Sequence, residues 1–246
     1  MSNKVALITG AIGGIGQALC EEFTNSGYFV IGTDQILGNC KCNKFIQIDI
    51  NEFLSENQKK SPNFELLFDL IAEKGLDVLV NNAAIQILGG TEDITLEDWQ
   101  NTLNTNLLSP FFTTQVLLKY LESKNGSVIN IGSVHARATK PGFVCYATSK
   151  SALVGLTNSM AVDLGPRIRV NGINPAATAT TMLLEGFKGK DDQFADLADK
   201  HPLKRIAQPS EIAKSALFLA SDDAKFITGT CLELDGGIGR RLHDPI

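Results

Sequence analysis

Short apolar runs rich in β-branched residues recur along the chain, and helical stretches separate them. The runs lie at 5–9, 28–33, 44–48, 76–80, 126–131, 167–173 and 231–234. Helices are expected at 14–26, 62–74, 96–123, 145–164 and 209–221. Strands that are apolar throughout are typical of a parallel sheet covered by helices on both faces. The pattern therefore predicts an α/β fold: a doubly wound parallel sheet of about seven strands with helices on both faces.

Length and composition are those of an ordinary globular protein. The chain has 246 residues, of which 43% are hydrophobic and 20% charged, and one domain over 1–246 is expected. The net charge is −5 without a block of Lys or Arg, so neither a nucleic acid nor a membrane surface is predicted as a partner. The segment 178–201 shows no clear strand periodicity and no strong caps, and is predicted to be a substrate-binding lid.

The first apolar run is interrupted by Thr9 and then by four glycines. It matches neither the apolar core of a signal peptide nor a spanning helix, and a cytoplasmic location is expected. The five cysteines are an odd number, and the pair Cys40 and Cys42 lacks the spacing of redox or zinc motifs. Free thiols used for packing are expected, and no metal site.

A glycine-rich loop follows the first predicted strand. Gly10, Gly14 and Gly16 lie between this strand and a helix. Without side chains the backbone can turn tightly and approach a pyrophosphate, whose charge then meets the N-terminus of the helix. This context, more than the glycine spacing itself, predicts a dinucleotide site.

Two aspartates follow the next strands. Asp34 ends the second run, 18 residues beyond Gly16, where a carboxylate can accept both ribose hydroxyls and repel a 2′-phosphate. Residue 13 is Gly and the loop has no Arg or Lys, so NAD(H) is predicted over NADP(H). Asp49 follows the third strand, where contact with the adenine and capping of a turn are equally compatible with the sequence.

Tyr146 and Lys150 are four residues apart at the start of a predicted helix, so they share one helix face. A nearby ammonium stabilises a phenolate, which would lower the pKa of the tyrosine and suit it to acid/base work. Tyrosine and lysine at this spacing are common on helices, and the pair alone favours an ordinary structural role.

The joint pattern resembles the short-chain dehydrogenases/reductases, single-domain NAD(P)-dependent enzymes with the Rossmann fold. It comprises the glycine loop, Asp34, "NNA" at 81–83, Asn106, Ser133, "YxxxK" at 146–150 and "DGG" at 235–237. The resemblance extends from Lys4 to Gly237. The order and spacing of these motifs make it far more specific than any one of them.

The resemblance implies a role for each matching residue. Tyr146 would be the proton donor or acceptor, and Lys150 would lower its pKa and hold the nicotinamide ribose. Ser133, 13 residues before the tyrosine, would bind the substrate oxygen. Asn106 would hold a water behind the lysine. The implied cofactor-binding residues are Gly10, Gly14, Ile15, Gly16, Asp34, Asp49, Ile50, Asn82, Ala83, Tyr146, Lys150, Thr178 and Thr180.

Two positions depart from the family pattern. Ala84 and Ala176 replace glycines that are usual after "NNA" and in "NPG", and the second narrows the space beside the nicotinamide. His135, two residues after Ser133, could bind substrate or serve a structural role. For Cys145, beside Tyr146, the sequence is compatible with a packing role and with a functional role.

These observations predict an NAD(H)-dependent oxidoreductase that interconverts a secondary alcohol and a ketone, with a sugar or polyol favoured as substrate. A 3-oxoacyl-thioester reductase is the alternative within the family, and a non-catalytic NAD(H)-binding sensor or scaffold is the alternative of another class. The resemblance implies a homotetramer or homodimer built through 96–123 and 145–164. The tail 238–246 suits either a subunit interface or an exposed end.

Overall fold

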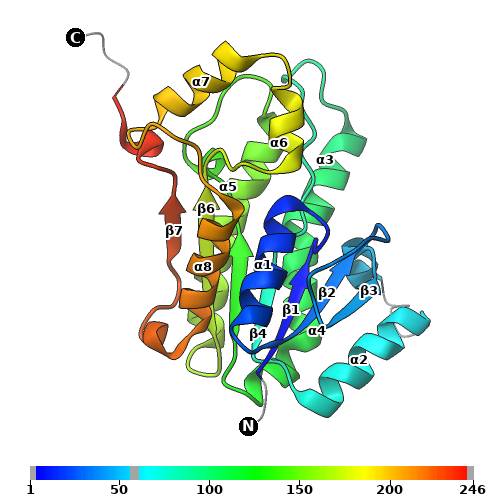
Figure 1. Ribbon diagram of the computed structural model, residues 1–246. Helices are drawn as coiled ribbons and strands as arrows, with labels where there is room; N and C mark the ends of the chain where they lie inside the picture. Colours follow the sequence, from blue (N-terminus) through cyan, green and yellow to red (C-terminus); the bar gives the residue numbers. More distant parts are fainter. Residues whose placement is uncertain (1–3, 56–60, 243–246) are drawn as a thin grey trace.

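Seven parallel strands form one sheet in the computed structural model, which describes residues 4–55 and 61–242 (Figure 1). The order across the sheet is β3-β2-β1-β4-β5-β6-β7. The strands are β1 (Val5–Thr9), β2 (Phe29–Asp34), β3 (Lys44–Gln47), β4 (Val78–Asn81), β5 (Ser127–Ile131), β6 (Arg169–Pro175) and β7 (Cys231–Leu234). The predicted seven-stranded, doubly wound fold is confirmed, and strand ends differ from expectation by one or two residues.

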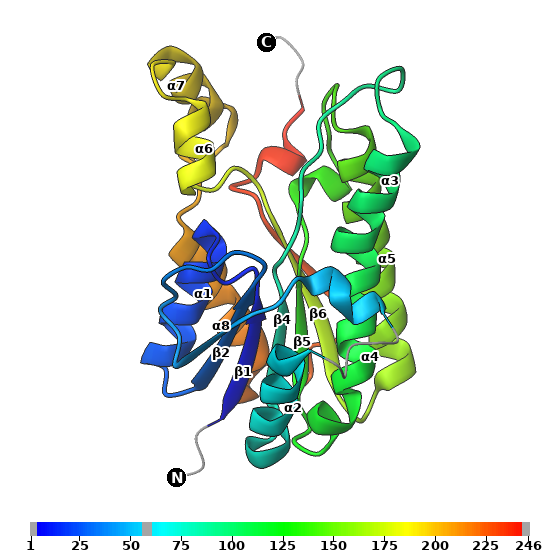
Figure 2. The ribbon, with the colours of Figure 1, turned by 90° about the vertical axis from the view of Figure 1, so that its right-hand side faces the viewer.

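Helices cover both faces of the sheet (Figure 2). One face carries α1 (Gly14–Asn25) and α8 (Pro209–Ala220). The other carries α2 (Pro62–Lys74), α4 (Ser109–Glu122) and α5 (Val144–Leu164). Each face has its own apolar core, which explains why the central strands are apolar on both sides.

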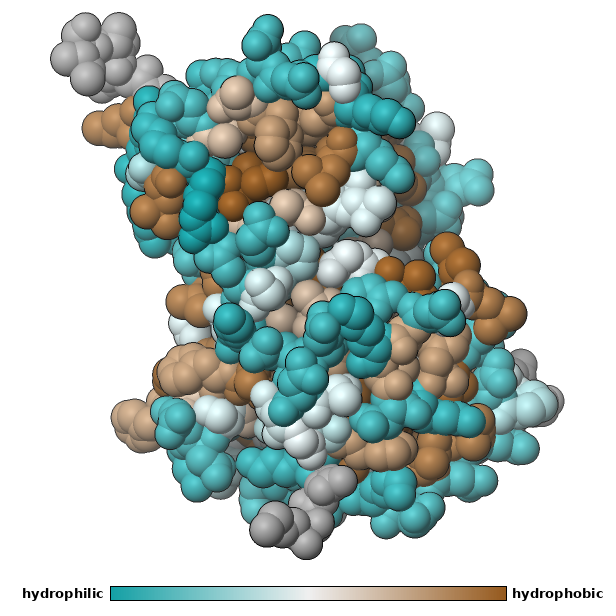
Figure 3. All heavy atoms as spheres, viewed as in Figure 1, coloured by the Kyte–Doolittle hydropathy of each residue, from teal (hydrophilic) through white to brown (hydrophobic). Residues whose placement is uncertain are grey.

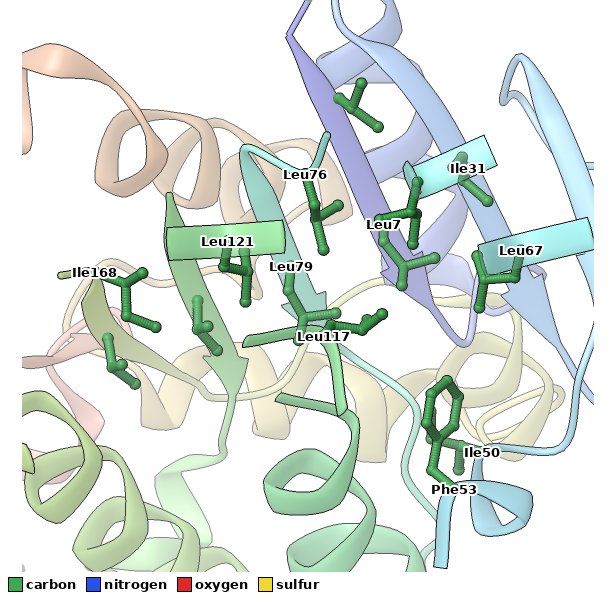
Figure 4. Close-up of a cluster of buried hydrophobic side chains, with 14 of the residues drawn as sticks. Leu7, Ile31, Ile50, Phe53, Leu67, Leu76, Leu79, Leu117, Leu121 and Ile168 are labelled. Atoms are coloured by element: carbon green, nitrogen blue, oxygen red, sulfur yellow. The ribbon is translucent and has the colours of Figure 1, made fainter. Parts of the chain in front are cut away.

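The larger core lies between the sheet and α2, α4 and α5. Leu7 and Leu79 from adjacent strands point toward Leu117 and Leu121 of α4 (Figure 4). All four side chains are fully buried. Burial of a leucine side chain contributes roughly 1.5–3 kcal/mol, so this cluster fixes how α4 lies on the strands.

The helix expected at 96–123 is not continuous. It consists of α3 (Leu96–Leu103), a π-helical turn η3 (Asn104–Leu108) and α4. A π turn admits one extra residue per turn and changes the direction in which side chains point. The residue that this turn presents, Asn106, is one of the predicted site residues.

The predicted lid segment forms two short helices, α6 (Thr181–Gly186) and α7 (Asp191–Lys200). Neither helix contains a buried residue. They lie beyond the carboxyl ends of the strands, at the top of Figure 1. Apolar side chains show on the surface in this part of the molecule, among hydrophilic neighbours (Figure 3).

The direction of strand addition reverses between β1 and β4. From β1 the chain builds outward through β2 and β3, and then from β4 to β7 in the other direction. Loops that leave neighbouring strands at such a reversal diverge and leave a ligand-binding crevice at the carboxyl ends. The remaining short helices are η1 (Ile50–Leu54), η4 (Val134–Ala136), η5 (Asp222–Ala224) and η6 (Ile238–Arg240). Residues 243–246 of the tail lie outside the described residues.

Candidate active site

The glycine loop between β1 and α1 has no room for side chains. Gly10 has a φ of +64°, and a Cβ there would lie 2.8 Å from the Cα of Ala83. A Cβ on Gly16 would collide with the carbonyl oxygen of Gly10. Gly13 precedes α1 and provides no side-chain cap. The first N–H groups of the helix thus follow a tight turn in which Gly10 and Gly13 have no side chains, which fits a dinucleotide pyrophosphate. Ile15 lies within the first turn of this helix.

Asp34 lies beside this loop, at the end of β2. Its Oδ2 accepts a hydrogen bond from the backbone N–H of Ile12 at 3.1 Å, and its Oδ1 accepts one from Ile36 at 3.2 Å. The carboxylate is only partly buried. It therefore retains acceptor capacity next to the loop, as the predicted contact with the adenosine ribose requires.

Asn82 joins β4 to the end of β1. Its Nδ2 donates to the carbonyl oxygens of Thr9 at 2.9 Å and Gly10 at 3.0 Å. The backbone N–H groups of Asn82 and Ala83 both donate to the Thr9 hydroxyl at 3.0 Å. These bonds hold the two strand ends together at the reversal point, and Ala83 forms the floor against which Gly10 packs.

Asp49 caps a short helix. Its Oδ1 accepts a hydrogen bond from the N–H of Asn51 at 2.9 Å, and Glu52 bonds back to the N–H of Asp49 at 3.2 Å. Ile50 is buried with 8% of its surface exposed. The capping alternative is thus observed.

Thr178 and Thr180 form the root of the lid. The Thr178 hydroxyl donates to the carbonyl oxygen of Ala176 at 3.0 Å, and Thr178 pairs with Ala207 in an isolated bridge. Thr180 caps α6. A Cβ on Gly14 would lie 2.8 Å from the Cβ of Thr180, so the lid begins in direct contact with the glycine loop.

Ser133, Tyr146 and Lys150 meet where β5 ends and α5 begins. Ser133 is buried and hydrogen-bonded to Tyr146. Lys150 is 2% exposed, its Nζ donates to the carbonyl oxygen of Ile131 at 2.9 Å, and it lies 5.8 Å from the Tyr146 ring centroid. The structure thus brings together a hydroxyl, a phenol and a buried amine.

Burial governs the acid/base properties of this group. It lowers the pKa of Lys150 from 10.5 to about 8. Burial also raises the pKa of Tyr146, and the hydrogen bond with Ser133 offsets part of that rise. The expectation that Lys150 lowers the tyrosine pKa differs from this result. Desolvation destabilises the phenolate of Tyr146. The amine of Lys150 is hydrogen-bonded to the carbonyl of Ile131, and its stabilisation of the phenolate is too weak to offset that cost.

Asn106 connects the π turn to the loop after β4 and to α5. It is 1% exposed. Its Oδ1 accepts from the N–H of Ile85 at 2.9 Å, while its Nδ2 donates to the Ile85 carbonyl at 2.9 Å and to Oγ of Ser149 at 3.0 Å. Ser149 in turn donates to the Tyr146 carbonyl at 2.7 Å. A continuous hydrogen-bond chain therefore links the π turn to α5.

His135 belongs to an aromatic wall beside Tyr146. Its ring stacks on Phe143 with centroids 4.3 Å apart and meets Tyr146 edge-on at 5.7 Å. Its Nδ1 bonds to the Thr139 hydroxyl at 2.9 Å. Burial and Lys140 lower its pKa, so the ring is neutral near pH 7 and offers a flat, uncharged surface to a substrate.

Cys145 faces away from this wall. It is fully buried, with its Sγ 3.6 Å from the carbonyl of Ile87 and 3.5 Å from the hydroxyl of Thr102. These contacts join α5 to α3 and to the loop after β4. The packing alternative for Cys145 therefore matches its surroundings.

A family model described as enoyl-(acyl carrier protein) reductase matches residues 10–239. A 3-oxoacyl-[acyl-carrier-protein] reductase, FabG, of Haemophilus influenzae is 36% identical and covers 97% of this chain and 99% of its own. The chain belongs to the short-chain dehydrogenase/reductase family. The resemblance noted from the motifs is thereby confirmed, and with it an oxidoreductase that acts on CH–OH and C=O groups.

Solved structures of family members have the same fold. Ligand-free aldohexose dehydrogenase of Thermoplasma acidophilum superimposes with a TM-score of 0.91 at 30% identity, covering 99% of this chain and 97% of its own. The 3-ketoacyl-(acyl-carrier-protein) reductase of Brucella melitensis, complexed with NADH, has a TM-score of 0.81 at 26% identity over 96% and 98%. The structure of ElxO with bound NADP has a TM-score of 0.86 at 28% identity, and the match covers 97% of this chain and 100% of ElxO. A nicotinamide dinucleotide is therefore the cofactor of this family site.

Three contributors to the family site escaped the sequence analysis. Thr9 and Ser149 are hydroxyls within a strand and a helix, and Ile131 acts through its backbone carbonyl. Ser149 lies three residues after Tyr146, a spacing that places it on the same side of the helix and could have been noticed. Every residue has a backbone carbonyl, so the sequence does not show that the one of Ile131 would bind Lys150.

Among residues 4–55 and 61–242, no helix combines the length and apolar character needed to cross a membrane. Within the same described ranges, no three His, Cys, Asp or Glu side chains are grouped so as to hold a metal ion.

Proposed function

We propose that this protein is an NAD(H)-dependent oxidoreductase that interconverts a secondary alcohol and a ketone, with a sugar-like or polyol-like substrate. The observation that carries the proposal is the convergence of Ser133, Tyr146 and the buried Lys150, whose Nζ lies 5.8 Å from the centroid of the Tyr146 ring. This arrangement offers two hydroxyls to one substrate oxygen and a cation close by.

Each side chain has a distinct part in the proposed reaction. The bound dinucleotide supplies or accepts the hydride. Ser133 orients the substrate oxygen, and Tyr146 donates its phenolic proton to that oxygen during reduction or accepts the proton during oxidation. Lys150 stabilises the phenolate that remains. Asn106 is a positioning residue, because it reaches α5 through Ser149.

The proposed cofactor site extends along the carboxyl ends of the strands. Gly10, Gly14, Ile15 and Gly16 would hold the pyrophosphate, and Asp34 the adenosine ribose. Asp49 and Ile50 would border the adenine, Asn82 and Ala83 the middle of the dinucleotide, and Thr178 and Thr180 the nicotinamide. The partly buried carboxylate of Asp34, 3.1 Å from the N–H of Ile12, supports NAD(H) over NADP(H), because a 2′-phosphate would meet a like charge.

Substitution of Asp34 tests the cofactor proposal. In fluorescence titrations the wild-type protein is expected to bind NADH at least tenfold more tightly than NADPH, and Asp34→Ser to lose that difference. Asp49→Ser is the matched control, since a residue at the adenine affects both cofactors equally. Tighter binding of NADPH than NADH by the wild type would overturn the proposal.

A sugar or polyol substrate is supported by two observations. Aldohexose dehydrogenase is among the similar structures, and the flat ring of His135 beside Tyr146 suits the C–H face of a polyol. The second candidate is a 3-oxoacyl-thioester reductase, which the FabG relative favours. Turnover of an alcohol panel with NAD, measured beside reduction of an acetoacetyl thioester with NADH, distinguishes them. NADH binding without turnover of any substrate would instead support the sensor or scaffold alternative.

We also propose that 1–246 is a single domain whose segment 178–201 closes over the substrate, and that the protein is cytoplasmic. An assembly of two or four copies through 96–123 and 145–164 is supported by exposed apolar side chains there, Val162 on α5 at 85% and Leu108 at the end of η3 at 38%. Light scattering is expected to report a dimer or tetramer that Val162→Lys weakens. Cell fractionation tests the location.

A further inference from the structure

Three cysteines gather at a place that the proposed chemistry does not use. Cys20 lies on α1, and Cys40 and Cys42 lie on the segment that joins β2 to β3. The Sγ of Cys40 donates to the Sγ of Cys20 at 3.3 Å. A Cβ on Gly32 would lie 2.9 Å from the Sγ of Cys40 and 3.1 Å from that of Cys42. The three sulfurs, here called the thiol cluster, therefore converge over one glycine of β2.

The thiol cluster is closed on the helix side and open on the loop side. Cys20 is fully buried in the core beneath α1, while Cys40 and Cys42 are partly exposed. Lys41 lies between the two loop cysteines, and its ammonium pairs with Glu21 at 2.7 Å. A small reagent can thus approach Cys40 and Cys42 from the loop side, where Cys40 is already in contact with Cys20 on α1.

Contacts within the cluster favour a thiolate. Hydrogen bonds from Cys20 and then Cys40 lower the pKa of Cys42. Hydrogen bonds with Cys40 and Cys42 raise the pKa of Cys20. The bond with Cys20 lowers the pKa of Cys40, but the bond with Cys42 and burial outweigh it and raise that pKa to about 12, so the thiolate is on Cys42. Cys231 differs, because burial raises its pKa and no second thiol is described beside it. A thiolate next to another thiol is the arrangement of oxidation-sensitive sites.

We propose that the thiol cluster is a reversible oxidation site, in which Cys20 and Cys40 form a disulfide when a hydroperoxide reaches the loop. The Cys42 thiolate attacks the O–O bond, forming a sulfenic acid and releasing hydroxide. The Cys40 sulfur then attacks the Cys42 sulfur, and the sulfenic oxygen leaves as the second hydroxide. The Cys20 sulfur, 3.3 Å from that of Cys40, attacks the Cys40 sulfur and returns Cys42 to its thiolate. The two thiol protons convert both hydroxides to water. Two thiols lose two electrons, and hydrogen peroxide gains them.

The disulfide would tie two walls of the proposed cofactor site together. An S–S bond is about 2.05 Å long, so the sulfurs must approach from 3.3 Å and draw the loop toward α1. A Cβ on Gly38 of this loop would lie 3.1 Å from the Ile12 side chain, and Asp34 bonds to the N–H of both Ile12 and Ile36. Oxidation is thus expected to disturb Asp34 and weaken NADH binding. This consequence rests on the proposed function, whereas disulfide formation does not.

Peptide mapping tests the disulfide directly. The protein is treated with hydrogen peroxide, its remaining thiols are alkylated, and it is cleaved after Glu21 and Lys41, which places the three cysteines in three peptides. The expected product links the peptides of Cys20 and Cys40 and disappears on treatment with dithiothreitol. Cys40→Ser removes it, whereas the control Cys231→Ser retains it. No linked peptide, or an end product that joins Cys42 to either partner, would overturn the assignment.

NADH titration of the oxidised protein tests the consequence. The dissociation constant is expected to rise at least threefold on oxidation and to return with dithiothreitol, with no change in Cys40→Ser. An unchanged constant in protein with the mapped disulfide would overturn the coupling to the cofactor site. Reduced protein that does not bind NADH at all would overturn the proposed function, and the mapping result would still decide the disulfide.

Discussion

The hydroxyl of Tyr146 is the atom on which the proposed proton transfer depends. Tyr146→Phe is expected to lower kcat by about 10²–10⁴-fold, the usual contribution of a general acid or base, while NADH binding stays within twofold. Tyr120→Phe, on α4 and away from the site, is the matched control and should keep full turnover. Undiminished turnover of the Tyr146→Phe variant in steady-state assays would contradict the mechanism.

The buried amine of Lys150 makes stability depend on pH. Its pKa falls from 10.5 to about 8 in the folded protein, so between these values the unfolded chain binds more protons. Stability therefore rises as pH increases through this window, and the cost of burying the ammonium, about 3 kcal/mol at most, is present in full below pH 8. Denaturant unfolding at pH 7.5 and 10.5 should show this gain in wild type relative to Lys150→Met. Parallel pH dependence in both proteins would contradict it.

At the scale of single residues, the sequence located side chains better than it described their surroundings. Asn106, Ser133, Tyr146 and Lys150 were predicted, and the structure brings them to one place. The pKa of Tyr146 was expected to fall, yet burial raises it. Desolvation depends on every atom around the phenol, most of them distant in sequence, whereas a spacing of four residues reports only the helix face.

The π turn between α3 and α4 is the element that presents Asn106 to the loop after β4. Asn106→Ala is expected to lower the free energy of unfolding by about 3 kcal/mol, because it leaves the part-buried backbone groups of Ile85 and the buried hydroxyl of Ser149 without this partner. Asn104→Ala in the same turn, where the side chain is only partly buried, should cost less than 1 kcal/mol. Equal losses in urea denaturation would show that Asn106 has no special role in the turn.

A positioning role for Asn106 also has a kinetic signature. The variant should lower kcat more than it raises KM, since Asn106 acts on α5 through Ser149 and touches no ligand. A change confined to stability would assign Asn106 to the fold alone.

At the scale of elements, the apolar pattern predicted which segments form helices and which form strands, but not where a helix is interrupted. The segment 96–123 was expected to be one helix, although Pro110 in the first turn of α4 is a residue typical of helix starts. The thiol cluster shows the same limit. Cys20 and Cys40 lie on either side of β2 in the sequence. They come together only when β2 has joined the sheet and α1 packs against it, and the apolar pattern does not report this proximity.

At the scale of the whole molecule, the predicted lid contributes little to the buried core. Neither α6 nor α7 contains a buried residue, and Lys188 and Lys190 between them are exposed. Segments of this kind open at low free-energy cost. Trypsin is therefore expected to cleave first at these lysines, and NADH to slow that cleavage at least threefold. Lys225, exposed at another part of the surface, is the internal control, and equal protection at both places would indicate global stabilisation instead.

The contact between Thr180 and Gly14 gives the lid and the glycine loop a shared boundary. A Cβ on Gly14 would lie 2.8 Å from that of Thr180, so a molecule resting on the loop alters the space available to the first residue of the lid. If the bound dinucleotide favours the closed form of the predicted lid, then by linkage closure must strengthen dinucleotide binding to the same degree. We then expect the dinucleotide to bind before the alcohol, and a dead-end alcohol analogue to bind tightly only in its presence.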